Sequence, residues 1–231
     1  MESDVLTLSD LLGKPEFLPP RRLENDIEAV LLRHLKRRGK SDFPVSTSDL
    51  TTLLEEYVSE LDLYADLSDY GDVEGATFFA KGGKPVVKIS AALSEAPNEN
   101  RLRSTLAHEF GHVFLHDPMF QRRAQQGSFE EESPVLQVSF RDGFSSSTDL
   151  FEHQAWCVCG ALLMPIGELS RIVGGMAAAA NHYSDIYLYS DLGLRIHAFV
   201  AKHFGVSKDL AGVRLLRAKV VTDQQPRPAL F

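Results

Sequence analysis

Cysteine is scarce in this chain of 231 residues, which contains only Cys157 and Cys159. They lie two positions apart in a segment whose apolar pattern predicts a helix, where they are too close to bridge each other without distortion. The sequence therefore offers no disulfide framework, and a reducing compartment fits its composition. Cys-x-Cys is also not the spacing of a structural zinc site. We interpret Cys159 as a small buried residue, with a thiol that touches a nearby metal as the alternative.

Long hydrophobic runs are also lacking. No apolar stretch approaches the roughly 18 residues that a membrane-spanning helix needs. The first residues, Met1–Asp4, are acidic and lack the basic region that precedes the apolar part of a secretory signal. We therefore expect a cytoplasmic protein with no membrane partner.

An excess of positive charge is absent as well, since the formal net charge is −8. Nucleic-acid-binding domains usually carry a basic face, so the charge argues mildly against DNA as the main ligand. Local basic clusters nevertheless occur at Arg21-Arg22, Lys36-Arg37-Arg38, Arg122-Arg123, and Arg214 with Arg217 and Lys219. We interpret them as solvated helix faces, with a secondary nucleic-acid contact as the alternative.

Apolar periodicity predicts a mixture of helices and short strands. The N-terminal part, residues 1–44, carries one helix at about Leu23–Arg38, and a second helix, capped near Ser46, includes the apolar residues from Leu50 to Leu61. The segments Ala76–Lys81 and Pro85–Ser90, joined through Gly82-Gly83, predict a β-hairpin. Further along we expect a helix at Asn100–His116, which Asp117-Pro118 ends, and a strand at Val135–Phe140. A further helix is expected at about Asp149–Met164. The tail that follows is expected to be helical, with Gly205 separating a helix at Leu194–Phe204 from one at Lys208–Arg217.

The predicted helix at Asn100–His116 contains the motif His108-Glu109-x-x-His112. Residues i and i+4 share one helix face, so the two imidazoles can bind a single Zn²⁺. Glu109 lies one step round the helix, near the same opening. It can accept a proton from metal-bound water without itself being a ligand.

A catalytic zinc needs a third protein ligand and an open position. His116 continues the four-residue spacing, but it lies about 12 Å along the helix axis from His108. We therefore interpret it as a helix-end residue or a packed ring. Glu152, in the first turn of the next helix, is the best candidate, and a surface charge that complements the helix dipole is the alternative role for it. His153 is its competitor.

The run Ser104–His112, continued to His116, and the later Glu-x-x-Ala helix that ends in Leu162-Leu163-Met164-Pro165 resemble the ImmA/IrrE family of metallopeptidases. The segment His203–Ser207 with its following helix is similar to the end of that family, and the similarity covers roughly residues 45–220. The resemblance implies Glu152 as the third zinc ligand, beside His108 and His112, with Glu109 as the catalytic residue. Where family members often have a second acidic residue and an Asn or Asp, this chain has Gln154 and Trp156, which leaves open what orients the zinc-binding imidazoles.

The resemblance also implies a fold. We expect an α+β, zincin-like metallopeptidase domain at residues 45–170, with a small antiparallel sheet beside the H-E-x-x-H helix. It would follow an N-terminal extension at 1–44 and precede a helical, helix-turn-helix-like region at 171–231. The hairpin strand Pro85–Ser90 precedes the zinc helix, and we hypothesise that it pairs with the substrate backbone.

The family's targets imply that the substrate is a helix-turn-helix repressor protein, whose cleavage relieves repression in a mobile-element, DNA-damage or phage-defence operon. Single-stranded DNA or another damage signal, acting on the basic clusters, is a hypothetical activator. Two alternatives stay open from the sequence. One is a non-catalytic regulator that acts through its helical tail, and the other is a zinc amidase with a small substrate.

Overall fold

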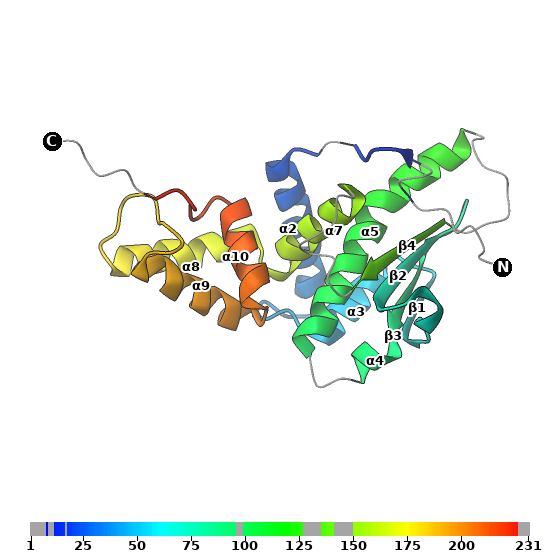
Figure 1. Cartoon of the computed structure of the whole chain (residues 1–231), viewed down its shortest axis with the longest axis horizontal. Helices are drawn as coiled ribbons and strands as arrows, with labels where there is room; N and C mark the ends of the chain where they lie inside the picture. Colours follow the sequence, from blue (N-terminus) through cyan, green and yellow to red (C-terminus); the bar gives the residue numbers. More distant parts are fainter. Residues whose placement is uncertain are drawn as a thin grey trace. The chain divides into compact units, whose positions relative to one another are not determined.

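A computed structural model gives the course of the chain (Figure 1). It describes residues 8, 12–16, 18–95, 99–126, 135–140 and 150–225, and for 135–140 it describes the backbone alone. Contacts divide the chain into two compact units. The first consists of the described residues up to Pro20 together with Ser46–Cys159, and the second of Arg21–Val45 together with the described residues from Gly160 onward. Since compactness alone defines these units, the domain boundaries expected at residues 44 and 170 stay predictions.

The first unit is a mixed α+β structure built around one sheet. Its elements are α3 (Thr47–Glu55), β1 (Glu60–Ala65), the 3-10 helix η1 (Ser68–Tyr70), β2 (Val73–Phe79), β3 (Val86–Ser90), α4 (Ala91–Ser94), α5 (Glu99–Gln125), β4 (Val135–Phe140) and most of α7 (Leu150–Leu163). The strand order is β1-β3-β2-β4. Helix α5 packs along β2, and α3 packs against α5 (Figure 1). The predicted α+β class is therefore confirmed.

The sheet differs from the predicted one in a strand that the sequence did not reveal. β2 runs antiparallel to β3, as expected of the hairpin, and also to β4, whereas β1 runs parallel to β3. Ser46 caps α3, and its hydroxyl accepts a hydrogen bond from the backbone N–H of Asp49 at 3.1 Å. The helix then ends at Glu55, and Leu61 pairs with Val87 in the sheet. Local periodicity had placed Leu61 in the helix because it does not report a distant strand partner.

The hypothesis that β3 receives the substrate as an added strand is wrong. β3 is paired on one side with β1 and on the other with β2. An added strand needs an exposed edge with unpaired backbone groups. β3 has no such edge.

Helix α5 continues beyond Pro118, where the sequence predicted its end. A proline in a helix interior ordinarily costs about 3 kcal/mol, because it removes one backbone hydrogen bond and crowds the preceding turn. Here the helix reaches Gln125. Phe120, in the turn after Pro118, is buried and packs with Phe79 of β2 and Phe151 of α7. Tertiary packing thus outweighs the local cost.

The same extension of α5 holds the β2–β3 turn. The side-chain amide of Gln121 donates to the carbonyl oxygens of Ala80 and Gly83, each at 2.9 Å, and its oxygen accepts from the backbone N–H of Gly82 at 3.0 Å. Gly82 has a φ of +72°, in the left-handed region that glycine enters without strain. The end of α5 and the hairpin are therefore fixed together.

Helices α5 and α7 approach each other closely at Gly111. A Cβ added there would lie 2.8 Å from the Cα and from the carbonyl oxygen of Ala155. We expect Gly111→Ala to lower the free energy of unfolding by about 1–3 kcal/mol. The atoms that the new Cβ would meet belong to the backbone of Ala155, which cannot move away as a flexible side chain can. Denaturant unfolding measures the effect.

The matched control for this prediction is Gly174→Ala in a helix of the second unit, α8 (Ile166–Ala179). A Cβ at Gly174 meets nothing within 4 Å. Alanine at position 174 should raise the free energy of unfolding by about 0.5–1 kcal/mol, because alanine is a better helix former than glycine. A Gly111→Ala protein that is stabilised like the control would contradict the close approach.

The second unit consists mainly of helices in its described residues. It contains most of α2 (Pro20–Arg37), together with α8, α9 (Asp191–Phe204) and α10 (Lys208–Arg217). Gly205 ends α9 with a φ of 57°, and the Ser207 hydroxyl caps α10 by accepting from Leu210 N–H at 3.1 Å. The predicted succession of helix, glycine turn and helix is present. A helix-turn-helix function for it stays a prediction.

Arg214 does not belong to a solvated basic face, so that part of the interpretation is wrong. Its side chain is 3% exposed, and its guanidinium pairs with the carboxylate of Glu24. Its Nε also donates to the carbonyl of Met164 at 3.0 Å. The Arg214 side chain therefore links α10 to α2 and to the residue that follows α7.

Within the described ranges, no single helix has the length and apolar character to cross a membrane. Helices α7 and α8 meet those two criteria only when they are taken together, as a bent pair.

Candidate metal centre

The structure brings His108, His112 and Glu152 together. The histidines lie one turn apart on α5, and Glu152 comes from the first turn of α7. Nε2 of His108 lies 3.1 Å from Oε2 of Glu152, and Nε2 of His112 lies 3.1 Å from Oε1. The two Nε2 atoms are 3.0 Å apart. Gly111, which allows α5 and α7 to approach closely, thus lies between the two histidines that meet Glu152.

This donor set fits a metal ion. The three side chains are buried, and their ligand atoms lie within 4.8 Å of one another. Ligands bound tetrahedrally at about 2.0–2.2 Å from a zinc ion are about 3.3 Å from each other, close to the separations seen here. Two imidazole nitrogens and one carboxylate oxygen form the ligand set of hydrolytic zinc centres that keep a position for water.

The charge state of Glu152 also suits a cation. Burial of its carboxyl favours the neutral form, since only 8% of the residue is exposed. The charges and hydrogen bonds of His112 and His108 outweigh that burial and hold the pKa of Glu152 well below its usual range. A metal ion between these groups acts in the same direction. The buried carboxylate is therefore ionised and faces positive charge.

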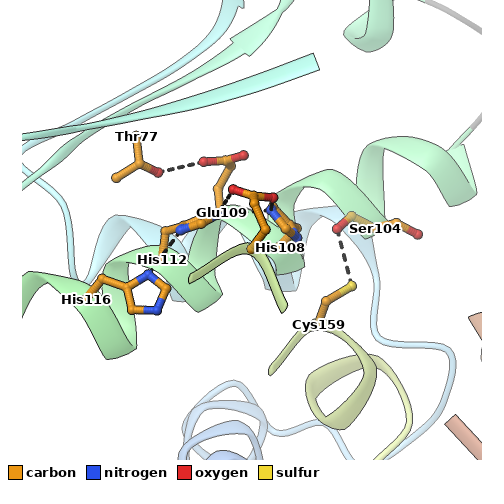
Figure 2. Close-up of polar contacts among 8 residues, drawn as sticks. Thr77, Ser104, His108, Glu109, His112, His116 and Cys159 are labelled. Atoms are coloured by element: carbon orange, nitrogen blue, oxygen red, sulfur yellow. Dashed lines mark hydrogen bonds and ion pairs between the residues drawn. The ribbon is translucent and has the colours of Figure 1, made fainter. Parts of the chain in front are cut away.

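Glu109 lies beside the three clustered residues but is turned toward the sheet (Figure 2). It is fully buried, and the Thr77 hydroxyl of β2 donates to its Oε2 at 2.6 Å. Gly75 lies two positions earlier on the same strand, and a Cβ there would come within 2.5 Å of Oε1 of Glu109. Strand β2 thus offers the Glu109 carboxylate a hydroxyl and the space that a glycine leaves.

Sequence reasoning missed Thr77 and Gly75. Alternate residues of a strand share a face, so Gly75, Thr77 and Phe79 point to one side of β2. A hydroxyl and a glycine on the core side of an apolar strand are the signal that could have drawn attention to them.

His116 lies outside the three-residue cluster, as expected, but it is not at a helix end. Its ring is fully buried in the interior of α5 and packs edge-on against Phe151 at 5.0 Å, so the packed-ring interpretation is confirmed. Its Nδ1 lies 3.1 Å from Nδ1 of His112 (Figure 2), and its Nε2 lies 3.2 Å from Oε1 of Gln154. Burial, and then the charge of His112, hold the pKa of His116 well below its ordinary value, so its ring is neutral. His153, the other competitor, is exposed and outside the cluster.

Trp156 packs against the ring of His108. The ring centroids of Trp156 and His108 are 4.4 Å apart. Nδ1 of His108 is buried, and no residue in the described part of the chain hydrogen bonds to it. The His108 ring is therefore held by packing, whereas His112 has a polar partner in His116.

Cys159 packs away from the cluster. Its Sγ lies 3.5 Å from the carbonyl oxygen of Ser104 (Figure 2). Burial raises the pKa of the Cys159 thiol well above its ordinary value, and the charge of Arg103 only partly offsets this. The side chain is therefore a neutral, buried thiol, as the sequence interpretation held.

One comparison with known proteins identifies a family. Residues 69–216, well over half of the chain, match the model of a peptidase family described as the IrrE N-terminal-like domain. The matched region contains His108, Glu109, His112 and Glu152, as well as Thr77 and Gly75. A search of curated proteins found no match.

Proposed function

The chain belongs to the IrrE N-terminal-like family of metallopeptidases, and from this premise we propose that it is a zinc-dependent endopeptidase. The observation that supports the proposal is the convergence of His108, His112 and Glu152 from two helices, with Glu109 beside them. The family gives the class of hydrolase. The identity of the metal and the preference for internal peptide bonds are our proposal.

The chain's own residues suit the hydrolysis of an amide bond. When bound, zinc supplies a Lewis acid that polarises the scissile carbonyl and lowers the pKa of water to about 7. His108, His112 and Glu152 would hold the ion. Glu109 accepts the proton of the attacking water and delivers it to the leaving amine. Thr77 fixes the carboxylate that performs both transfers.

The metal is tested first. We expect elemental analysis of the purified protein to find about one zinc per chain, since two imidazoles and a carboxylate suit this ion. A chelator should remove the zinc together with the activity, and added zinc should restore both. A fully active protein without bound metal would exclude the proposed mechanism.

For the substrate, we propose a helix-turn-helix repressor, as the resemblance to repressor-cleaving peptidases implies. The experiment incubates the zinc-loaded protein with a helix-turn-helix repressor, taken from the neighbouring gene if that gene encodes one, and mass spectrometry identifies the products. A single internal cut that the chelator prevents is the expected result. An intact repressor, together with cleavage of a small amide substrate, would favour the amidase alternative.

We propose single-stranded DNA, or another damage signal, as the activator. Arg214 is engaged with Glu24. The exposed basic residues of the four clusters are therefore Arg21 and Arg22, Lys36-Arg37-Arg38, Arg122 and Arg123, and Arg217 with Lys219. An oligonucleotide should bind more weakly as salt increases, and it should speed repressor cleavage. Binding without any change in cleavage would remove DNA as the activator.

Thr77→Val tests how Glu109 is held. Valine keeps the shape of threonine but loses the hydroxyl, and a hydrogen bond to a charged group contributes about 1.5–3 kcal/mol. We expect kcat for the cleaved repressor to fall about 10- to 100-fold, with unchanged zinc content. Thr77→Ser, which retains the hydroxyl, should recover most of the rate. Equal loss in both variants would assign Thr77 a packing role instead.

A further inference from the structure

The position of Glu152 depends on the end of a helix. Glu152 lies in the first turn of α7, which begins at Leu150. The backbone N–H groups of a first turn have no partners within the helix, so helix ends open more readily than helix interiors. A side chain in such a turn keeps a fixed position only when tertiary contacts hold the turn. Two neighbours of Glu152, Phe151 and Gln154, make contacts of this kind.

Phe151 packs with a residue from near the start of the chain. Its side chain is fully buried in an apolar cluster with Leu8, Phe79 of β2 and Phe120 of α5. Leu8 is also fully buried, and the partly buried Leu12 packs against the same cluster. An N-terminal leucine therefore belongs to the cluster that buries the first turn of α7.

Gln154 binds the same part of the chain through a hydrogen bond. Its Nε2 donates to the backbone carbonyl oxygen of Glu16 at 2.8 Å. The Glu16 carboxylate also pairs with Arg122 of α5 at 2.8 Å, but both side chains are more than half exposed, so this ion pair contributes little. We call Leu8 together with residues 12–16 the N-terminal strap. The strap thus meets α7 through one buried side chain and one backbone carbonyl.

The C-terminal part of α5 also contacts the N-terminal strap. Phe120 shares the apolar cluster with Leu8, and Arg122 pairs with Glu16. The strap lies outside residues 69–216, which match the family model. Its contacts with α5 and α7 are therefore a feature of this chain that the family match does not cover.

We propose that the N-terminal strap is a positioning element that holds the first turn of α7, and with it Glu152, beside His108 and His112. The inference rests on the proposed function, since it takes Glu152 as a metal ligand. Without the strap the turn opens more often, and only its closed form offers all three ligands. Apparent affinity falls in proportion to the competent fraction, so a turn closed about one tenth of the time binds zinc about tenfold more weakly.

Leu8→Ala tests the strap, and the first measurement is hydrogen exchange in the metal-free protein, followed by nuclear magnetic resonance. The backbone N–H groups of residues 154–157 bond to the carbonyls of the first turn of α7, so their exchange reports the opening of that turn. We expect these amides to exchange about tenfold faster in Leu8→Ala. Leu8→Met keeps the buried volume and should stay within about a factor of three of the wild type.

The matched control is Leu67→Ala. Leu67 is buried in a different apolar cluster of the same unit, with Ala65, Val73 and Ala76. Its truncation also leaves a cavity and destabilises the unit, but it does not touch the strap. We expect wild-type exchange at residues 154–157 in this variant. Equal acceleration by Leu8→Ala and Leu67→Ala would show that these amides follow global unfolding, and it would overturn the proposal.

Zinc affinity, titrated against a chelating dye, is the second measurement. Leu8→Ala should bind zinc about tenfold more weakly, whereas Leu8→Met and Leu67→Ala should stay within about threefold of the wild type. Circular dichroism checks folding, and Leu8→Val, a smaller truncation with a smaller expected shift, replaces Leu8→Ala if that variant does not fold.

Two results would overturn the proposal. One is wild-type exchange in a folded Leu8 variant, and the other is faster exchange with unchanged zinc affinity. A wild type that bound no zinc would instead contradict the proposed function. The exchange measurement would then still decide whether the strap holds the first turn of α7, because it is made without metal.

Discussion

Glu109→Gln should abolish hydrolysis while leaving the zinc in place. Glutamine has the size of glutamate, and its amide oxygen can still accept from the Thr77 hydroxyl. It cannot, however, take a proton from water at neutral pH. Positioned general acid–base groups contribute about 10²–10⁴ in rate, so we expect kcat for the repressor to fall by about that factor. Product formation is followed by mass spectrometry, and elemental analysis should still find zinc, because Glu109 lies outside the three-residue cluster.

The matched control is Glu99→Gln, in the first turn of the same helix. Glu99 is exposed and accepts a hydrogen bond from Thr47, so its replacement should leave turnover unchanged. The same variant of Glu109 also separates the enzyme from the non-catalytic regulator. If Glu109→Gln, with its zinc, still relieved repression in cells, the protein would act by binding, and cleavage would not be its function.

The metal-binding face of α5 could be predicted because its pattern is local. The motif His108-Glu109-x-x-His112 lies within a few residues on one predicted helix, and helical geometry alone places the two imidazoles together. Glu152 was harder, because its approach depends on how α7 packs on α5. Spacing left it as one candidate among several, and the family resemblance singled it out.

The surroundings of the motif could not be predicted in the same way, because each part depends on a distant partner. Thr77 can contact Glu109 only because β2 packs against α5. The contacts of Gln154 likewise depend on Glu16 and His116, which are distant in the sequence. The error at Pro118 has the same origin. A local rule ended the helix there, and packing of Phe120 against Phe79 continued it.

Glu152→Ala should abolish metal binding, and its effect should not be limited to the loss of a charge at the N-terminus of α7. Tight zinc sites bind with about 10–16 kcal/mol shared among their ligands, so the loss of one ligand should weaken binding about a hundredfold or more. Zinc at a thousandfold excess over its dissociation constant stabilises a protein by about 4 kcal/mol. We therefore expect a chelator to lower the Tm of the wild type markedly and that of Glu152→Ala hardly at all. Thermal unfolding with and without the chelator measures both.

The competing role for Glu152 is that of a surface charge at a helix N-terminus. Glu168 occupies the corresponding first turn of α8, pairs with Arg171 and His203, and lies outside the metal-binding cluster. Glu168→Gln should lower the free energy of unfolding by about 0.3–1 kcal/mol through the helix dipole and its partly exposed ion pairs, and it should leave zinc binding intact. If Glu152→Gln behaved in the same way, with wild-type zinc affinity, Glu152 would be no more than a dipole charge. The low exposure of Glu152 and its two contacts with the histidines argue that its replacement removes zinc binding. A buried, ionised carboxylate needs a cation nearby to offset the cost of its burial.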